Sequence, residues 1–337
     1  MNKLLPLLTI LIIISCSKEI TSDKLVVRSD LVYEINKDKP FDGVSKEFFY
    51  NGQLKEEYSY KKGKLHGDHK EYYSNGQLKE SGLYNENKRV GLNEMYYENG
   101  QIQTKTTFNQ DGKYNGLLET FFSNGRLEFS GEYVEGIPKG THTGFYFNGQ
   151  MKGFIEFKDG KVLDGIYEYF SENGSLKSIE RYKNGMLDGL TENFDSNGKI
   201  NERINYQNGK KNGLHEQYYF KNLDCLRSVK TYINDNLVTQ ETYQMDLNDR
   251  CPGSPILSTK QHFKNSKEHG VNIFFSSIKP FDIHMVSCYK DGNRLKKGYE
   301  SSPQGLGDTE RNREIWKSFI QKNRKSILNN TYCDQYF

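Results

Sequence analysis

Hydrophobic and polar residues alternate along most of this chain, in a pattern that recurs every 24 or 25 residues. In each repeat an aromatic residue stands three positions before an Asn-Gly pair, an aliphatic residue follows the Gly by two positions, and a second aromatic follows six positions later. The Gly residues of the pairs are Gly52, Gly76, Gly100, Gly125, Gly149, Gly174 and Gly198. Alternation indicates β-strands and a fixed period indicates a repeat fold, so the pattern predicts stacked β-hairpins.

The spacing inside one repeat predicts the type of hairpin loop. Leu78 and Tyr84 are six residues apart, so they lie on the same face of their strand. A two-residue Asn-Gly loop would pair Tyr73 with Leu78, whereas a three-residue loop over 74–76 would pair Tyr72 with Leu78. The Tyr72 position is aromatic in all seven repeats and the Tyr73 position is not. We therefore predict a type I turn with a G1 bulge, its Gly left-handed, and a looser loop between successive hairpins.

These repeats resemble the MORN repeat variant of bacteria, whose proteins are often described as YwqK-like antitoxins. The following residues and their counterparts carry the resemblance: Gly67, Tyr72, Asn75, Gly76, Leu78 and Tyr84. It covers about residues 41–245, with seven clear repeats and one degenerate copy at Asn222-Leu223. The resemblance implies a mainly β fold, an elongated meander of antiparallel hairpins with a period of about 24 residues. The antitoxin label implies little about activity, because a fold does not dictate function.

The amino terminus is typical of an exported protein. A short positive region ends at Lys3, and an apolar stretch from Leu4 to Ile14 is too short to span a bilayer stably. The segment that ends at Cys16 resembles a bacterial lipobox, which implies removal of residues 1–15 and lipidation of Cys16. An ordinary signal peptide or a membrane anchor, with Cys16 incidental, is the alternative. We expect residues 16–40 to form a tether and a first edge strand (Leu31 to Ile35), and the protein to lie in the cell envelope as an outer membrane lipoprotein, periplasmic or surface-exposed.

The period is lost after Tyr243. We expect a long loop over residues 245–259, one or two diverged hairpins with an insertion within residues 246–300, and a helix over residues 308–329 inside a C-terminal cap (301–337). The apolar stripe of this helix contains Ile315, Trp316, Phe319, Ile320 and Ile327. A terminal helix protects the last strand of a sheet from edge pairing.

Four cysteines, Cys225, Cys251, Cys288 and Cys333, lie in the carboxy-terminal third. In an exported chain they indicate two disulfides, with three possible connectivities. Cys225–Cys251 with Cys288–Cys333 is the first choice because both bonds would pin the irregular part. Free buried thiols are the alternative.

Charge and motifs argue against several classes of function. The chain has 47 basic and 44 acidic residues, well interspersed, which argues against a nucleic-acid footprint. No nucleophile elbow, phosphate-binding loop or dinucleotide fingerprint occurs, so we expect no enzyme activity, cofactor or small-molecule substrate. His66 and His69 surround a turn without an acidic partner at metal spacing, so we expect surface roles and no metal. The aromatic rows are expected to form the core. Recognition is assigned to charged positions between them: Lys70, Glu71, Lys79, Glu80, Glu119, Glu168 and Lys177.

The functional hypothesis is a non-catalytic, membrane-anchored lipoprotein whose repeat sheet is a protein-binding scaffold in the bacterial envelope. It rests on the lipobox, on the repeats and on the missing catalytic constellation. One alternative is an antitoxin or immunity protein that neutralises a partner toxin. Another is a surface protein that binds lipid or glycan through exposed aromatic residues.

Overall fold

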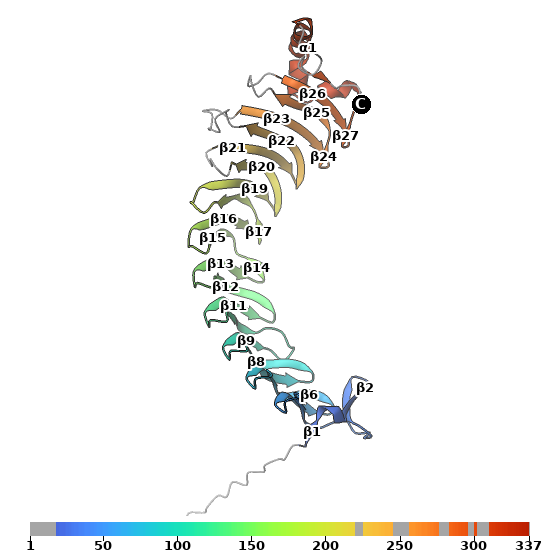
Figure 1. The fold of residues 1–337 in the computed structure, drawn as a ribbon, viewed down its shortest axis with the longest axis vertical. Helices are drawn as coiled ribbons and strands as arrows, with labels where there is room; N and C mark the ends of the chain where they lie inside the picture. The colour runs from blue at the N-terminus through green and yellow to red at the C-terminus, as the bar shows by residue number, and fades with distance from the viewer. Residues whose placement is uncertain are drawn as a thin grey trace, which may run out of the picture. The chain divides into compact units, whose positions relative to one another are not determined.

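The structure, a computed structural model, describes residues 18–219, 225–244, 256–275, 283–295, 300–301 and 310–336. The chain divides into two compact units, Met1–Gly149 and Gln150–Phe337, which are described separately. Both units are built mainly of β-hairpins that follow one another along the chain (Figure 1). Cys16 and Cys251 lie outside the described residues.

The first unit contains twelve named strands and one short 3-10 helix, η1 (Ser22–Lys24), among its described residues. Its strands are β1 (Glu19–Thr21), β2 (Leu25–Arg28), β3 (Leu31–Glu34), β4 (Gly43–Phe48), β5 (Leu54–Lys61), β6 (Lys64–Tyr72), β7 (Leu78–Asn85), β8 (Lys88–Tyr96), β9 (Ile102–Phe108), β10 (Gly116–Phe121), β11 (Leu127–Val134) and β12 (Ile137–Phe145). Strands β4 to β12 pair with their sequence neighbours in one antiparallel meander, as the repeat pattern predicts.

The segment before the repeats is folded, so the expectation of a tether is wrong for its described part, Lys18 onward. Strand β1 runs parallel to β4 and forms the edge of the meander, with Glu19 opposite Val44. Strands β2 and β3 form a separate hairpin, so the strand expected at Leu31 to Ile35 does not begin the repeat sheet. The backbone N–H of Val32 donates to the carbonyl of Gly63, which holds this hairpin against the first repeat. These backbone bonds, which polar composition does not reveal, order the segment.

The second unit continues the same pattern. Its strands are β13 (Met151–Lys158), β14 (Lys161–Val162), β15 (Gly165–Phe170), β16 (Leu176–Lys183), β17 (Met186–Leu187), β18 (Gly189–Phe194), β19 (Ile200–Gln207), β20 (Lys210–Tyr218), β21 (Leu226–Ile233), β22 (Asn236–Gln244), β23 (Ile256–Lys264), β24 (Lys267–Glu268), β25 (Gly270–Phe275), β26 (Ile283–Lys290), β27 (Asn293–Arg294) and β28 (Glu300–Ser301). Two hairpins lie beyond Ile256, as expected. The long loop predicted as far as residue 259 ends earlier, because Ile256 pairs with Gln244 at the start of β23.

The carboxy-terminal cap consists of α1 (Glu310–Leu328) and η3 (Tyr332–Tyr336). Ile327 and Tyr332 pack into a buried cluster with Val271, Ile273 and Val286 of the last hairpins, and Phe319 and Ile320 border it. The side chains of Ile315 and Trp316 lie outside the described part. Within the described residues, no helix has both the length and the apolar character needed to cross a membrane.

One disulfide in the cap region joins Cys288 of β26 to Cys333 of η3, the second pair of the preferred connectivity. Cys225 is also disulfide-bonded. Since Cys251 lies outside the described residues, the pairing of Cys225 with Cys251 stays a prediction.

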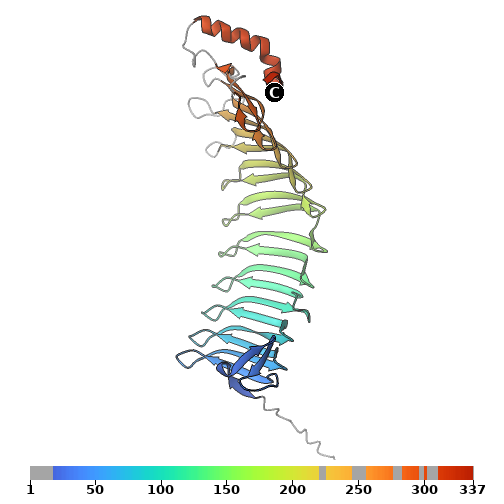
Figure 2. The same ribbon diagram turned by 90° about the vertical axis from the view of Figure 1, so that its right-hand side faces the viewer.

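The Asn-Gly loops have the three-residue form that strand parity predicts. Tyr72 is the partner of Leu78, and the backbone N–H of Tyr73 donates to the carbonyl of Gln77 at 2.8 Å. Gly76 closes the turn through a bond from its N–H to the Tyr73 carbonyl, with φ of 85°. All seven Gly residues of the pairs have φ between 76° and 92°, where a side chain is disfavoured. Figure 2 shows these loops following one another along the sheet edge within each unit.

Several connections between hairpins are tighter than expected. At Lys62-Gly63 and at Glu86-Asn87 both residues have positive φ, and Lys61 pairs directly with Lys64. These are two-residue type I′ turns, so the prediction of a looser second loop is wrong at these connections. Between β9 and β10 the connection is longer, and the N–H of Asn109 donates to the carbonyl of Lys113. Type I′ turns twist with the flanking strands, which favours them between long paired strands even without an Asn-Gly sequence.

The Asn side chains of the loops also link consecutive repeats in the first unit. Asn75 accepts a bond from the N–H of Gln77 in its own loop, and its Nδ2 donates to the carbonyl of Glu98 in the next loop at 3.2 Å. The same donation to the next loop is made by Asn51, Asn99 and Asn124. The Asn residue therefore closes its own turn and also sets the spacing of the loops.

Replacing Asn75 by Asp tests this link. Asp keeps the acceptor for Gln77 but loses the Nδ2 donor and brings a negative charge to the Glu98 carbonyl, so we expect a loss of about 0.5–1 kcal/mol in free energy of unfolding. Chemical denaturation of the wild type and the variant would measure it. Asn173→Asp is the matched control, because the bonds described for Asn173 lie within its own loop. Equal losses in the two variants would contradict the link between repeats.

Burial in the repeat sheets is inverted relative to the expectation of an aromatic core. Tyr72, Leu78 and Tyr84 are half-buried, whereas His69 and Asn93 are buried. Each repeat strand packs chiefly against its neighbours in the same sheet. Without a second layer to cover them, large side chains at these positions keep partial contact with water, and short polar side chains between them are shielded most. In the second unit the buried polar residues include Ser178, Thr191, His215 and Ser228.

Candidate functional site

Four glutamates stand directly opposite one another across four adjacent strands of the first unit. Glu47 of β4 pairs with Glu56 of β5, Glu56 with Glu71 of β6, and Glu71 with Glu80 of β7. Directly opposed residues share a face of the sheet, and like charges in such pairs are destabilising. The row of glutamates therefore needs cationic side chains or hydrogen-bond donors that offset this repulsion.

Cations contact three of the four carboxylates. Lys55 lies 2.5 Å from Glu47, and this bond, the largest cause, lowers the pKa of the Glu47 carboxyl. Burial raises the pKa of the Glu56 carboxyl, and its hydrogen bond with Glu47 adds to the rise. The two neighbouring carboxyl groups thus have pKa values displaced in opposite directions, as expected when like charges are close.

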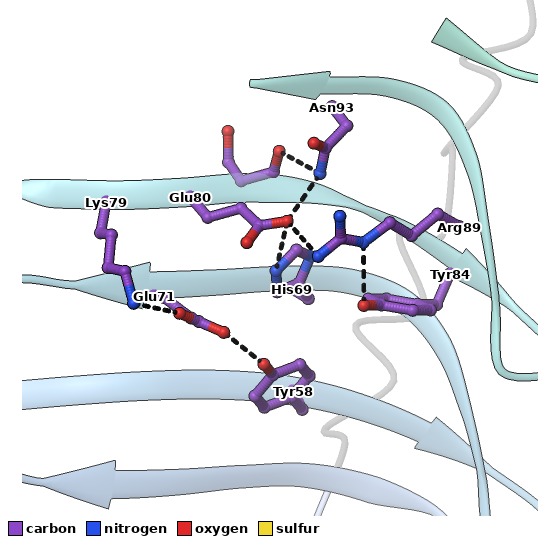
Figure 3. A network of polar contacts seen from close by, with 9 residues as sticks. Tyr58, His69, Glu71, Lys79, Glu80, Tyr84, Arg89 and Asn93 are labelled. Atoms are coloured by element: carbon purple, nitrogen blue, oxygen red, sulfur yellow. Dashed lines mark hydrogen bonds and ion pairs between the residues drawn. The ribbon is translucent and has the colours of Figure 1, made fainter. Parts of the chain in front are cut away.

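The other two glutamates of the row, Glu71 and Glu80, form hydrogen bonds and ion pairs with neighbouring side chains (Figure 3). The hydroxyl of Tyr58 donates to Glu71 at 2.7 Å, and Lys79 donates to the other oxygen of Glu71 at 3.2 Å. Arg89 contacts Oε1 of Glu80 at 2.6 Å. Burial and the bond to Glu71 both raise the pKa of the Tyr58 hydroxyl, so this hydroxyl remains a donor at neutral pH.

His69 lies beside this row and is 2 % exposed, so the expected surface role for His69 is wrong. Its ring stacks on Tyr58, with centroids 5.2 Å apart, and meets the ring of Tyr84 edge-on at 5.1 Å. Its Nε2 lies 3.6 Å from Oε1 of Glu80, and neither ring nitrogen has a hydrogen-bond partner among the described residues. Burial lowers the pKa of the imidazole, which favours the neutral form.

Three possible metal ligands meet at this point. One ligand atom each from His69, Glu71 and Glu80 can be chosen so that all lie within 4.8 Å of one another. Sequence reasoning missed the group because Glu80 lies across a hairpin from His69. The three-residue loop places residue 71 opposite residue 80, so the register already contained the signal.

A related cluster lies in the second unit. His215 holds the same repeat position as His69, two residues after a glycine within the strand. Its Nε2 is 2.6 Å from Glu202, which also accepts bonds from Asn193 and Gln217. The bond with His215, followed by the two amide bonds, lowers the pKa of the Glu202 carboxyl to about 2. In this cluster the single carboxylate of Glu202 forms hydrogen bonds with His215, Asn193 and Gln217.

Exposed aliphatic residues lie on the face of the repeat strands opposite the buried polar residues, in both units. Leu92 immediately precedes buried Asn93, and Ile166 immediately precedes buried Tyr167, so alternation directs the aliphatic residues to the other face. We call the following exposed residues the aliphatic row: Leu83, Leu92 and Leu117 in the first unit, and Ile166 and Leu214 in the second. Exposed apolar side chains repeated on one face are unusual unless something covers them.

Some of the charged side chains expected to serve recognition are exposed to solvent, and others are buried. Lys70, Lys177 and Glu168 are exposed. Glu80 is 5 % exposed, so the recognition role expected of Glu80 is wrong. The sequence did not reveal that Glu80 is buried and Lys79 exposed, because both residues are charged. The register, which pairs Glu80 with Glu71, determines which of the two faces the buried side.

Five segments of the chain match the family model described as the MORN repeat variant: residues 41–62, 65–86, 89–110, 163–184 and 187–208. These segments are MORN repeats of the variant type. Residues 111–162, between the third and fourth matches, contain the same hairpin elements within each unit, β10 to β12 and β13 to β14.

The chain is also similar to parts of much larger solved structures. The crystal structure of TcdB2-TccC3 shares 13% identity, at 79% coverage of this chain and 16% of that chain, with a TM-score of 0.18. The crystal structure of TcdB2-TccC3-Cdc42 shares 9% identity, at 78% coverage of this chain and 18% of that chain, with a TM-score of 0.18. The structure of the Tc holotoxin pore of Photorhabdus luminescens shares 12% identity, at 81% coverage of this chain and 16% of that chain, with a TM-score of 0.18. The chain thus spans less than a fifth of these structures, and TM-scores this low carry no conclusion about function. No curated protein matches the chain significantly.

Proposed function

We propose that this protein is a non-catalytic scaffold of the bacterial envelope, anchored by lipid on Cys16, whose MORN repeats bind a protein partner through the aliphatic row. The observation that supports binding is the inverted burial of the repeats. In three strands a buried polar or aromatic residue follows an aliphatic residue that is exposed. The exposed positions recur with the repeat, so they form a row and not scattered single residues.

The composition of the row fits a protein surface better than a small ligand. Interfaces combine apolar anchors with a polar rim. Charged side chains border the row in the second unit: Arg181 is the cross-strand partner of Ile166, and Arg203 lies 3.5 Å from Glu192 on the same sheet. A sheet face with apolar anchors and ion pairs beside them suits an extended protein partner.

The amino-terminal fold supports a short anchor. Cys16 precedes β1 by three residues, and β1 is paired with β4. Several acyl chains on Cys16 would hold the protein firmly, at about 0.8 kcal/mol per buried methylene. In this proposal the repeats begin at the surface of the membrane, which is the outer membrane. Mass spectrometry of the mature protein is expected to show a diacylglyceryl group on Cys16, and an unmodified Cys16 would remove the anchor from the proposal.

The binding proposal is tested with the full chain in its own envelope. The variant Leu92→Asp/Leu117→Asp charges two positions of the row, whose exposures are 45% and 47%. Ile137→Asp is the matched control, because Ile137 is 50% exposed at a hairpin turn outside the row. We expect cross-linking and affinity capture to recover a partner with the wild type and the control, and to lose it with the double variant. The partner, once purified, should bind directly with an affinity at least tenfold lower for the double variant. Capture that is equal for all three proteins would overturn the role of the row.

The two alternatives make different predictions. A YwqK-like antitoxin would rescue cells from a toxin encoded nearby, so absence of such a gene counts against immunity. A lipid- or glycan-binding protein would still associate with liposomes or glycans as Cys16→Ser. Flotation of that variant with liposomes would therefore favour a lipid surface over a protein partner.

A further inference from the structure

We propose that His69, Glu71 and Glu80 bind one divalent transition-metal ion, and that zinc is the ion they suit best. The site lies on the face of the first unit opposite the aliphatic row, so it is independent of the proposed protein-binding surface. An imidazole with two carboxylates is a ligand set that zinc accepts, and three protein ligands leave one position for water.

The positions of the ligands are close to those that an ion needs. With metal–ligand bonds of about 2.0–2.2 Å, two ligands of one tetrahedral ion lie roughly 3.4 Å apart. Nε2 of His69 and Oε1 of Glu80 are already 3.6 Å apart, and all three ligand atoms lie within 4.8 Å. Small side-chain rotations therefore complete the site without moving the strands. His69 and Glu71 lie two residues apart on β6, and Glu80 is the cross-strand partner of Glu71 on β7, so the paired backbone fixes their spacing.

Two features of the site are costly without a cation. The buried ring nitrogens of His69 have no hydrogen-bond partner within the described part of the chain, and burial of unpaired polar atoms opposes folding. In addition, the four glutamates of the row outnumber the three cationic side chains that contact them, Lys55, Lys79 and Arg89. An ion on Nε2 of His69 would satisfy that nitrogen and reduce the repulsion within the row at the same time.

The repeats themselves show that this combination is specific. In the other repeats the position of His69 is occupied by Ser45, Asn93, Leu118, Tyr167 and Thr191, and by two further histidines, His142 in the first unit and His215 in the second. Nε2 of His142 bonds to the carbonyl of Glu132 at 2.9 Å. Among the described residues, the three-ligand group occurs at His69 alone. His215 already shares a hydrogen bond with Glu202 through its Nε2, so the nitrogen that would bind an ion is engaged there.

Arg89 sets a limit on the affinity. Its guanidinium contacts the same oxygen of Glu80 that faces His69, and Nδ2 of Asn93 donates to this oxygen at 3.0 Å, so the ion competes with both donors. We therefore expect binding weaker than that of structural zinc sites with four protein ligands. We also expect little response to Mg²⁺ or Ca²⁺, because these ions prefer oxygen ligands.

Calorimetric titration of the full chain with ZnCl₂ tests the proposal, with Cys16→Ser in every sample to remove one thiol. We expect one saturable Zn²⁺ per chain, a rise in Tm with Zn²⁺, and at least tenfold weaker binding for His69→Asn. Asn is the natural residue at the equivalent position 93, so this variant is expected to fold. His215→Asn is the matched control and should bind within twofold of the parent. Absence of saturable one-to-one binding, or equal binding by His69→Asn, would overturn the site.

A spectroscopic readout keeps the test independent of the stability of His69→Asn. Co²⁺ bound to an imidazole and two carboxylates in a four- or five-coordinate site absorbs visibly, whereas hydrated Co²⁺ absorbs weakly. We expect this absorption in the parent and in His215→Asn, and its loss in Glu71→Gln, whose side chain is only half-buried. Unchanged absorption in Glu71→Gln would show that the ion binds elsewhere and would overturn the assignment.

Discussion

Replacing both Cys288 and Cys333 by Ala is expected to lower the free energy of unfolding of the cap region by about 2–4 kcal/mol. The bond joins β26 to η3 across 45 residues of sequence, and a crosslink over such a loop strongly restricts the unfolded chain. Both cysteines are fully buried in the cluster that packs the cap on the last hairpins. Their loss therefore loosens the same contact that covers the end of the sheet.

Urea unfolding followed by Trp fluorescence would measure this effect, because Trp316, the single Trp of the chain, belongs to α1. Leu328→Ala is the control: this residue is on the same helix and exposed, so its loss should change the free energy by less than about 0.5 kcal/mol. If the double variant unfolded at the urea concentration of the wild type, the cap would be held by packing alone.

Gly153→Ala is expected to destabilise the start of the second unit by about 2–4 kcal/mol. Gly153 of β13 pairs with Tyr169 of β15 and has φ of 147°, a conformation that disfavours a side chain. A Cβ at this position would lie 2.9 Å from the carbonyl oxygen of Glu168 and 2.7 Å from the Tyr169 ring. The backbone oxygen cannot rotate away, so β13 and β15 would have to separate.

Gly198→Ala separates the two causes of this loss. Gly198 has φ of 76°, but no described atom lies within 4 Å of the position that a methyl group would take, so only the backbone penalty of about 1–2 kcal/mol applies. Thermal unfolding would compare the variants, and amide hydrogen exchange in β15 would show where pairing is lost. Equal losses for the two variants would mean that the contact with Glu168 relaxes at no cost.

Local spacing predicted the repeat elements well because each depends on residues close in sequence. Parity between Leu78 and Tyr84 predicted the three-residue loop, and the register of Tyr72 with Leu78 agrees with it. Helical periodicity predicted α1 to within two residues at either end. The tether was predicted wrongly, and so was the looser second loop at connections such as Glu86-Asn87. Backbone bonds such as Val32 to Gly63, and the twist that favours type I′ turns, leave little trace in residue type.

The sequence by itself determined the period, the hairpins, the Asn-Gly turns and the terminal helix, since strand alternation and turn preferences act over a few residues. Only the tertiary structure decided what each face contains. Cross-strand register brought Glu71 and Glu80 beside His69, and it aligned Asn75 with the next loop. The single-layer packing of the strands buried short polar residues and exposed Leu92 and Ile166. Which side chains meet water depends on strands from several repeats together, and no single repeat encodes that outcome.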